Sequence, residues 1–177
     1  MRRQQLEHII RAAAGITGAT EFVIVGSQAV LGQFPQAPDD LLVSIEADVF
    51  SLRNPADSDL IDGSKGEGSP FHQTFGYYAH GVGVETAVLP EGWRDRLVPI
   101  HNPNTGAGTG FCPEIHDLAV SKLVAGREKD LEFLSGILRH RLASVESIRS
   151  RLGDTALPPE RLATCLHRLD RIIGTLR

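Results

Sequence analysis

The sequence has few cysteines and no long apolar run. The first shortage argues against disulfide-rich and zinc-binding proteins, and the second against membrane-spanning ones. Of its two cysteines, Cys112 and Cys165, neither belongs to a CxxC motif or to a Cys/His spacing typical of zinc ligands. Neither a disulfide framework nor a zinc site is indicated, and we expect free thiols in a reducing cytoplasm. No apolar run approaches the roughly 20 residues that a membrane-spanning helix needs, and no signal-peptide segment follows the N-terminal arginines. These features predict a cytoplasmic protein without membrane contact.

The chain also lacks an excess of basic charge, because 18 Lys and Arg residues stand against 22 Asp and Glu residues. With a net charge of -4, a protein that binds nucleic acid over its whole surface is not expected, although a local basic patch is compatible with this balance. A GxxxxGK[ST] motif is absent, and the glycines at 108–110 lack the strand and helix context of a dinucleotide-binding turn. The P-loop and Rossmann classes are therefore not indicated.

The order of the hydrophobic patterns predicts an α+β fold. Apolar residues at helical spacing over 4–16 predict an opening helix, and the apolar run 22–25 predicts a buried strand. The following segments are expected to be a short helix over 28–34, a loop over 35–40, strands over 41–50, 86–89 and 96–100, a polar surface excursion over 54–76 with a short helix near 57–61, and a loop over 102–110.

Beyond residue 112 the pattern becomes helical. Residues 114–140 predict one long helix, and two more are expected over 145–152 and 160–176, the last after a Pro-Pro start signal. The chain is therefore expected to form an α/β core over 1–112 and a C-terminal helical region over 113–177 that packs on the core.

Two acidic residues in SIEADVF are the first candidates for chemistry. Glu46 and Asp48 are two positions apart, so on a strand their side chains share one face, while Ile45, Ala47 and Val49 face the core. A cation would relieve the repulsion between the carboxylates, and Mg²⁺ commonly binds one or two carboxylates together with substrate phosphates. The alternative is that both acids lie on the solvated face of an edge strand.

The turn at Gly26-Ser27 is the second candidate. It follows a buried strand and precedes a helical pattern. Free backbone N–H groups at a helix start bind phosphate, glycine allows close approach of the backbone, and serine adds a hydroxyl donor. The alternative is an ordinary serine cap at the start of a helix.

Together, VGS followed by E-x-D on the next strand resembles the polymerase-β-like nucleotidyltransferase superfamily, in which a Gly-Ser or Gly-Gly turn precedes an acid-x-acid strand. The wider set VGSQAVLGQFP, SIEADVF, FGYYAHGVGVETAVLPEGWRDRL and DLAVSKLVAGREKDLEFL is similar to a family of small bacterial nucleotidyltransferase-fold proteins of largely unassigned function. That family is distantly related to the AbiEii-type toxins. The resemblance covers roughly residues 22–138 and implies a mixed β-sheet flanked by helices.

The resemblance also implies roles for residues. Gly26 and Ser27 would hold the nucleotide phosphates, and Glu46 and Asp48 would bind a divalent metal, Mg²⁺ or alternatively Mn²⁺. The superfamily usually adds a third carboxylate on a later strand. Glu85 is the nearest candidate, because it opens the expected strand ETAVLP.

Two further residues leave alternatives open at this site. His80 could complete it instead of the third acid, or be a structural histidine. Trp93, the only tryptophan, could stack on a base or pack in the core.

The segment 118–138 carries four charged residues of interest. On a helical wheel Arg127 and Asp130 fall in the middle of an apolar arc, which predicts a buried ion pair. Lys122 and Lys129 share one edge of that arc and are expected to reach nucleotide phosphates. The alternative is a structural salt bridge bracketed by surface lysines.

The implied function is transfer of a nucleoside monophosphate from an NTP to an acceptor hydroxyl on RNA, protein or a small molecule. The alternative is a catalytically silent nucleotidyltransferase-fold module that binds or senses nucleotides or a protein, for instance in a toxin–antitoxin or defence system. The sequence leaves both a monomer and a homo-oligomer open.

Overall fold

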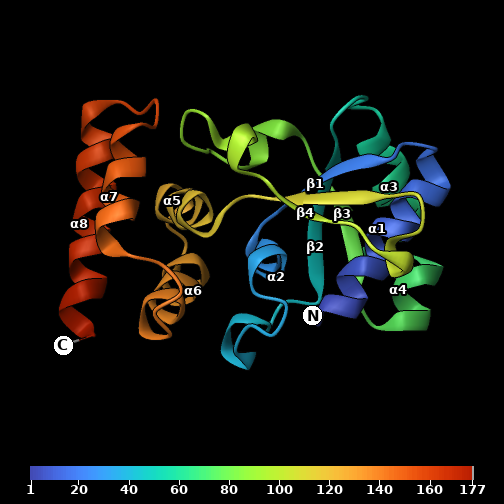
Figure 1. Ribbon diagram of the computed structural model, residues 1–177, viewed down its shortest axis with the longest axis horizontal. Helices are drawn as coiled ribbons and strands as arrows, with labels where there is room; N and C mark the ends of the chain where they lie inside the picture. Colours follow the sequence, from blue (N-terminus) through green and yellow to red (C-terminus); the bar gives the residue numbers. More distant parts are fainter. Residues whose placement is uncertain (177) are drawn as a thin grey trace.

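A computed structural model describes residues 1–176 and shows a mixed five-stranded sheet with helices packed beside it and a group of helices at one end of the molecule (Figure 1). The strands lie in the order β3-β2-β1-β5-β4. Their bounds are β1 (Glu21–Val25), β2 (Glu46–Ser51), β3 (Tyr78–Gly81), β4 (Val98–Ile100) and β5 (Thr109–Cys112). β1 pairs antiparallel with β2 and parallel with β5, whereas β2 and β3 are parallel and β4 and β5 antiparallel. The expected α+β class is confirmed.

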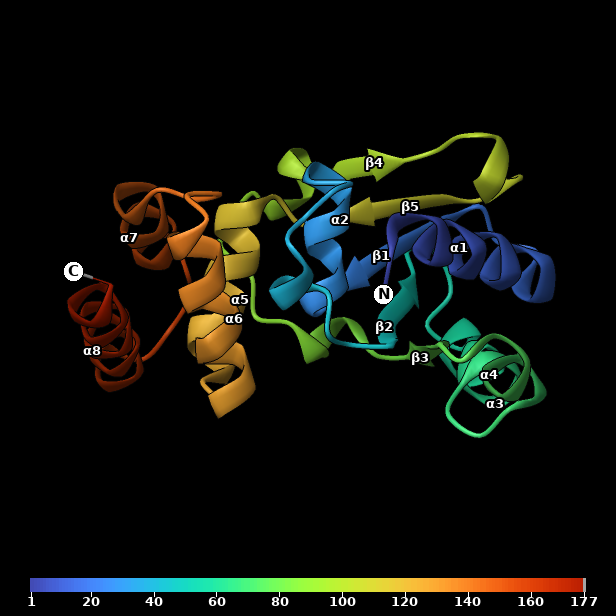
Figure 2. The ribbon, with the colours of Figure 1, turned by 90° about the horizontal axis from the view of Figure 1, so that it is seen from below.

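The helices surround this sheet unevenly. Their bounds are α1 (Arg3–Thr17), α2 (Val30–Gln33), α3 (Asp57–Lys65), α4 (Pro70–Phe75), α5 (Ile115–Ala125), α6 (Glu128–Arg139), α7 (Val145–Gly153) and α8 (Pro159–Thr175). Figure 2 shows α1, α3 and α4 beside the sheet, α7 and α8 at the opposite end of the molecule, and α5 and α6 between them. Among residues 1–176, no helix combines the length and apolar character needed to cross a membrane.

The alternation of side chains along β1 and β2 gives the sheet two different faces. Phe22 and Ile24 join Ala47 and Val49 in a core that includes the apolar side of α1. Val23, Val25, Phe50 and Val82 form a smaller cluster on the other face, against which Ala87, Trp93, Leu97 and Phe111 pack. Glu46 and Asp48 alternate with Ala47 and Val49, so they point to this second face, away from α1.

The C-terminal helices have a core of their own. Buried residues of α5, α6, α7 and α8 pack together, including Leu123, Leu134, Ile148 and Leu169. Other residues of α5 and α6, among them Phe133, belong to the core beneath the sheet. These two helices therefore connect both clusters, and a domain boundary near residue 112 stays a prediction.

The single helix expected over 114–140 is wrong, because the chain breaks it into α5 and α6. Gly126 ends α5 with a φ of +64°, in the left-handed region that glycine adopts more easily than other residues. Its backbone N–H donates to the carbonyl of Lys122, which closes the helix end. The wheel drawn through the whole segment therefore placed Arg127 incorrectly.

Several strand predictions also need correction. Residues 86–89 form no strand in the described chain, and a short 3₁₀ turn spans Val84–Thr86 instead. The strand expected over 41–50 begins only at Glu46, so Ile45 precedes it and is exposed rather than buried. β3 and β5 were not expected, since each has only four residues and includes glycine. The polar segment 54–76 contains two helices, α3 and α4.

Candidate active site

Two neighbouring strands bring four polar side chains together on the sheet face opposite α1. Within the parallel pair, Glu46 of β2 lies beside Tyr78 of β3, and Asp48 lies beside His80. Because side chains two residues apart share a face, Tyr78 and His80 lie on the same side as the two acids. The acid-x-acid strand of the sequence is thus confirmed as a strand, and β3 adds a phenol and an imidazole to it.

The distances in this group are short. His80 Nδ1 lies 3.2 Å from Asp48 Oδ1 and 3.3 Å from Glu46 Oε1. The hydroxyl of Tyr78 donates a hydrogen bond of 3.0 Å to Glu46 Oε2. One ligand atom from each of Glu46, Asp48 and His80 lies within 4.8 Å of the other two. The three side chains form the group that we call the β2–β3 cluster.

The electrostatics of the β2–β3 cluster reflect two carboxylates held close together. Burial and the neighbouring Glu46 raise the pKa of Asp48 to about 6. Burial alone would raise the pKa of Glu46, but hydrogen bonds with Asp48, Tyr78 and His80 outweigh it and lower that pKa. Burial and the bond to Glu46 raise the pKa of Tyr78 to about 12, so the phenol stays a donor. A bound cation would relieve the crowding of negative charge.

Gly26 lies directly against Asp48. Val25 is the strand partner of Asp48, and the chain turns at Gly26 with a φ of +73°. A Cβ atom at position 26 would lie 2.5 Å from Asp48 Oδ2. Ser27 then begins a three-residue 3₁₀ turn that leads into the four-residue α2. Since this helix is short, phosphate binding at the turn would depend on local N–H groups and the Ser27 hydroxyl more than on helix charge.

The residues present fit a divalent cation. Carboxylate oxygens are the ligands that Mg²⁺ and Mn²⁺ prefer, and imidazole is a common ligand of transition metals. The glycine at position 26 leaves open the space beside Asp48 that a side chain would fill. Glu46 and Asp48 are the residues that would hold the ion, and His80 lies beside them.

A second charged group lies where α5 meets α6. The buried carboxylate of Asp130 accepts a hydrogen bond of 2.9 Å from Lys122 Nζ and one of 2.6 Å from Arg127 Nε. The pairing of Asp130 with Arg127 was expected, but the buried base is Lys122. Arg127 precedes α6, and its side chain is 62% exposed. The prediction of a buried Arg127 is therefore wrong, because the helix break at Gly126 turns that residue outward.

The pKa of Arg127 is raised, and the carboxylates of the β2–β3 cluster contribute to this shift. The hydrogen bond to Asp130 is the largest cause of the raised pKa of Arg127, and the charges of Asp48 and Glu46 raise it further. The sequence predicted Arg127 to be structural and missed this placement. The glycine before it was the available signal, since Gly commonly ends a helix and redirects the chain beyond it.

The other sequence-predicted residues are scattered. Glu85 is exposed in the 3₁₀ turn Val84–Thr86, outside the β2–β3 cluster, and its carboxylate folds back over Gly83. His80 therefore occupies the position beside the two acids where Glu85 was expected. Lys129 is exposed on α6, and its phosphate contact stays a prediction. Trp93 is partly buried against the Val23 side of the sheet, with the guanidinium of Arg94 5.4 Å from its ring centre.

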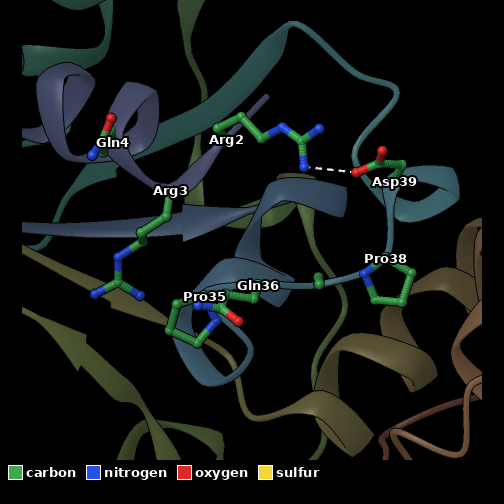
Figure 3. Close-up of a pocket in the computed structure, with 8 residues that line it drawn as sticks. Arg2, Arg3, Gln4, Pro35, Gln36, Pro38 and Asp39 are labelled. Atoms are coloured by element: carbon green, nitrogen blue, oxygen red, sulfur yellow. Dashed lines mark hydrogen bonds and ion pairs between the residues drawn. The ribbon is translucent and has the colours of Figure 1, made fainter.

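An open pocket of the molecule lies away from the β2–β3 cluster. It has a volume of about 500 Å³ and lies between the start of α1 and the segment 35–39 (Figure 3). Arg2 and Asp39 form an ion pair of 2.6 Å at its edge. None of its lining residues belongs to the β2–β3 cluster. The candidate chemistry therefore lies on the sheet face, not in this cavity.

A comparison with known protein families shows which family the chain belongs to. Residues 4–157 match the family described as "nucleotidyltransferase of unknown function" (DUF6036). The chain belongs to this family. No curated protein and no solved structure shows a significant match. Membership confirms the expected family of unassigned function, whereas the relation to AbiEii-type toxins stays a prediction. The description of the family as a nucleotidyltransferase implies an NTP as substrate and the use of divalent metal ions in general.

Proposed function

We propose that the protein transfers a nucleoside monophosphate from an NTP to an acceptor hydroxyl, with a divalent metal held by Glu46 and Asp48. The observation that carries this proposal is the contact of the Gly26-Ser27 turn with a strand that presents both acids. A phosphate bound at the turn would lie beside a metal bound at the strand. Family membership supports the same reaction class.

The residues around the β2–β3 cluster have separate roles in this proposal. Ser27 and the backbone at Gly26 bind phosphate oxygens, and Tyr78 holds the Glu46 carboxylate in place through its hydrogen bond. Arg127, supported by Asp130, offers a guanidinium to the triphosphate. Lys122 keeps Asp130 ionised and in position, so its contribution to nucleotide binding would pass through Arg127.

The reaction replaces a phosphoanhydride bond of the NTP with a phosphodiester bond to the acceptor. The acceptor oxygen forms a bond to the α-phosphorus, the bond from this phosphorus to the bridging oxygen breaks, and pyrophosphate and one proton are released. The bound metal would neutralise charge on the triphosphate and favour an in-line geometry.

A labelling experiment tests the proposal. The protein is incubated with each α-labelled NTP, Mg²⁺ or Mn²⁺, and one of three acceptor fractions: total cellular RNA, total protein or a small-molecule extract. We expect label in one acceptor fraction and loss of that label in the Glu46→Gln/Asp48→Asn double variant. Asp39→Asn is the matched control, since Asp39 is exposed and pairs with Arg2 outside the β2–β3 cluster.

Two outcomes would contradict the proposal. Transfer that persists in the double variant would place the chemistry elsewhere. Tight NTP binding by the wild type without transfer to RNA, protein or a small-molecule fraction would instead indicate the catalytically silent binding module.

A further inference from the structure

The β2–β3 cluster contains a histidine where a third carboxylate was expected, and this changes which ion it suits. A purely oxygen-lined site matches Mg²⁺, which is a hard ion with near-octahedral oxygen coordination. An imidazole nitrogen is a softer ligand that favours transition metals. We propose that His80 Nδ1 is the third metal ligand and gives the site a preference for Mn²⁺ over Mg²⁺. The inference rests on the metal site of the proposed function but not on the transfer reaction.

The geometry of His80 suits a shared ion. Its Nδ1 lies 3.2 Å from one oxygen of Asp48 and 3.3 Å from one oxygen of Glu46. Adjacent ligands on an octahedral ion are separated by about 3 Å when each lies roughly 2.1 Å from the metal. The two nitrogen–oxygen separations therefore match adjacent positions of a coordination shell, and one ligand atom from each of the three residues lies within 4.8 Å of the other two.

Tyr78 determines which oxygen of Glu46 is available to the ion. The phenol donates to Oε2, whereas Oε1 is the oxygen that approaches His80. Glu46 would then bind the ion through Oε1 alone. The Tyr78 bond fixes the carboxylate plane, as outer-shell partners of metal ligands commonly do.

Of the divalent transition ions, Mn²⁺ suits this mixed set best. Two carboxylates and open positions for phosphate or water favour an ion that accepts octahedral oxygen ligands, which Mn²⁺ shares with Mg²⁺. The single imidazole is the ligand that separates the two ions. Gly26 keeps the Asp48 side of the group open, because any side chain there would contact Oδ2.

The nitrogen ligand can be detected directly. The wild-type chain is loaded with Mn²⁺ alone, without nucleotide, at pH 8, and electron spin-echo spectra are recorded. We expect a ¹⁴N modulation from a directly bound imidazole. In His80→Asp we expect bound Mn²⁺ without that modulation. Wild-type Mn²⁺ without ¹⁴N modulation, or no Mn²⁺ binding at all, would overturn the proposal.

Metal selectivity supplies a second readout. Dissociation constants for Mg²⁺ and Mn²⁺ are measured by calorimetry for each variant. The ratio of the two constants is then compared between variants, so that any difference in affinity that the two ions show at every site cancels. We expect the preference for Mn²⁺ to fall by at least about fivefold in His80→Asp. His167→Asp, an exposed histidine on α8, is the matched control and keeps the wild-type ratio. An unchanged ratio in His80→Asp would also overturn the proposal.

The substitution is compatible with folding, and its failure can be told apart from failure of the proposed function. His80 is 49% exposed on β3, which is an edge strand, so the variant is expected to unfold within a few degrees of the wild type. The wild-type spectrum needs no variant at all. A ¹⁴N signal without nucleotidyl transfer would reject the transfer reaction and leave the metal assignment standing. Nucleotidyl transfer by a protein that binds Mn²⁺ through oxygen ligands alone would reject the assignment of His80 as a ligand and leave the transfer reaction standing.

Discussion

A side chain at Gly26 and the carboxylate of Asp48 cannot occupy the same space: a Cβ at position 26 would lie 2.5 Å from Asp48 Oδ2. The φ of +73° at Gly26 is an additional obstacle to any L side chain. Gly26→Ala should therefore lower the free energy of unfolding by at least about 1 kcal/mol and displace Asp48. Urea unfolding and Mn²⁺ titration of the variant check both effects.

Gly15→Ala is the control for this substitution. Gly15 is exposed within α1, and a Cβ there would meet no atom within 4 Å. Alanine should raise helix stability at this position by up to about 1 kcal/mol and leave metal binding unchanged. Equal effects of the two substitutions on metal binding would argue against the contact between Gly26 and Asp48.

Asp130 is predicted to be a major source of stability where α5 meets α6. In Asp130→Asn the buried ammonium of Lys122 loses its charged partner, so we expect a loss of about 3 kcal/mol or more in unfolding free energy. Arg127→Gln should change stability by no more than about 1 kcal/mol, since that side chain is mostly exposed. Chemical denaturation of both variants checks the assignment of Lys122 as the buried partner.

The same carboxylate predicts a pH dependence. Burial would raise the pKa of Asp130, but its hydrogen bonds with Arg127 and Lys122 outweigh burial and hold that pKa below its usual value. The stabilisation is therefore complete above the unfolded-state pKa of about 3.9 and is lost as the pH falls through the lower, folded-state pKa. The stability difference between wild type and Asp130→Asn should be constant from about pH 5 to 7 and shrink below about pH 4. A difference that grows toward acid pH would contradict this.

The fold was predictable where the sequence pattern is local. The run 22–25 and the opening helix follow from apolar spacing alone, and both are confirmed. β3 was not predictable in this way, because YAHG has little apolar character and becomes a strand by pairing with β2. A strand that forms mainly by pairing with a neighbouring strand shows only a weak hydrophobic pattern in its own sequence.

The candidate site was predictable only in its first half. The turn at Gly26 follows β1 and the acids lie on β2, the next strand along the chain, so the resemblance of VGS and E-x-D to a nucleotidyltransferase site implied their proximity. The sequence offered His80 only as an alternative to Glu85 and did not indicate Tyr78, because both join the acids through the register of β2 and β3. Arg127 was misplaced because a helical wheel assumes one unbroken helix, and Gly126 breaks it.

Tyr78→Phe should weaken metal binding without affecting the fold. The substitution removes one hydrogen bond to Glu46 and leaves the ring in place. Loss of an outer-shell partner lowers metal affinity by about tenfold in comparable sites. Tyr77→Phe is a matched control, because the Tyr77 hydroxyl bonds to His8 instead, at 2.7 Å. Calorimetric Mn²⁺ titrations should separate the two; equal affinities would remove Tyr78 from the support of Glu46.

Arg127→Gln should weaken NTP binding while the protein stays folded. The guanidinium is exposed and is held by the buried Asp130. The charges of Asp48 and Glu46, where the triphosphate is proposed to bind, contribute to its raised pKa. Removing one charged contact to a phosphate should raise the dissociation constant of an NTP by about tenfold. Arg139→Gln, at the last residue of α6, is the control, since Arg139 pairs with Asp40. Binding is measured by calorimetry with Mn²⁺ and a non-hydrolysable NTP. An unchanged affinity in Arg127→Gln would show that the guanidinium only stabilises the start of α6. The phosphates would then be bound by Gly26, Ser27 and the metal alone.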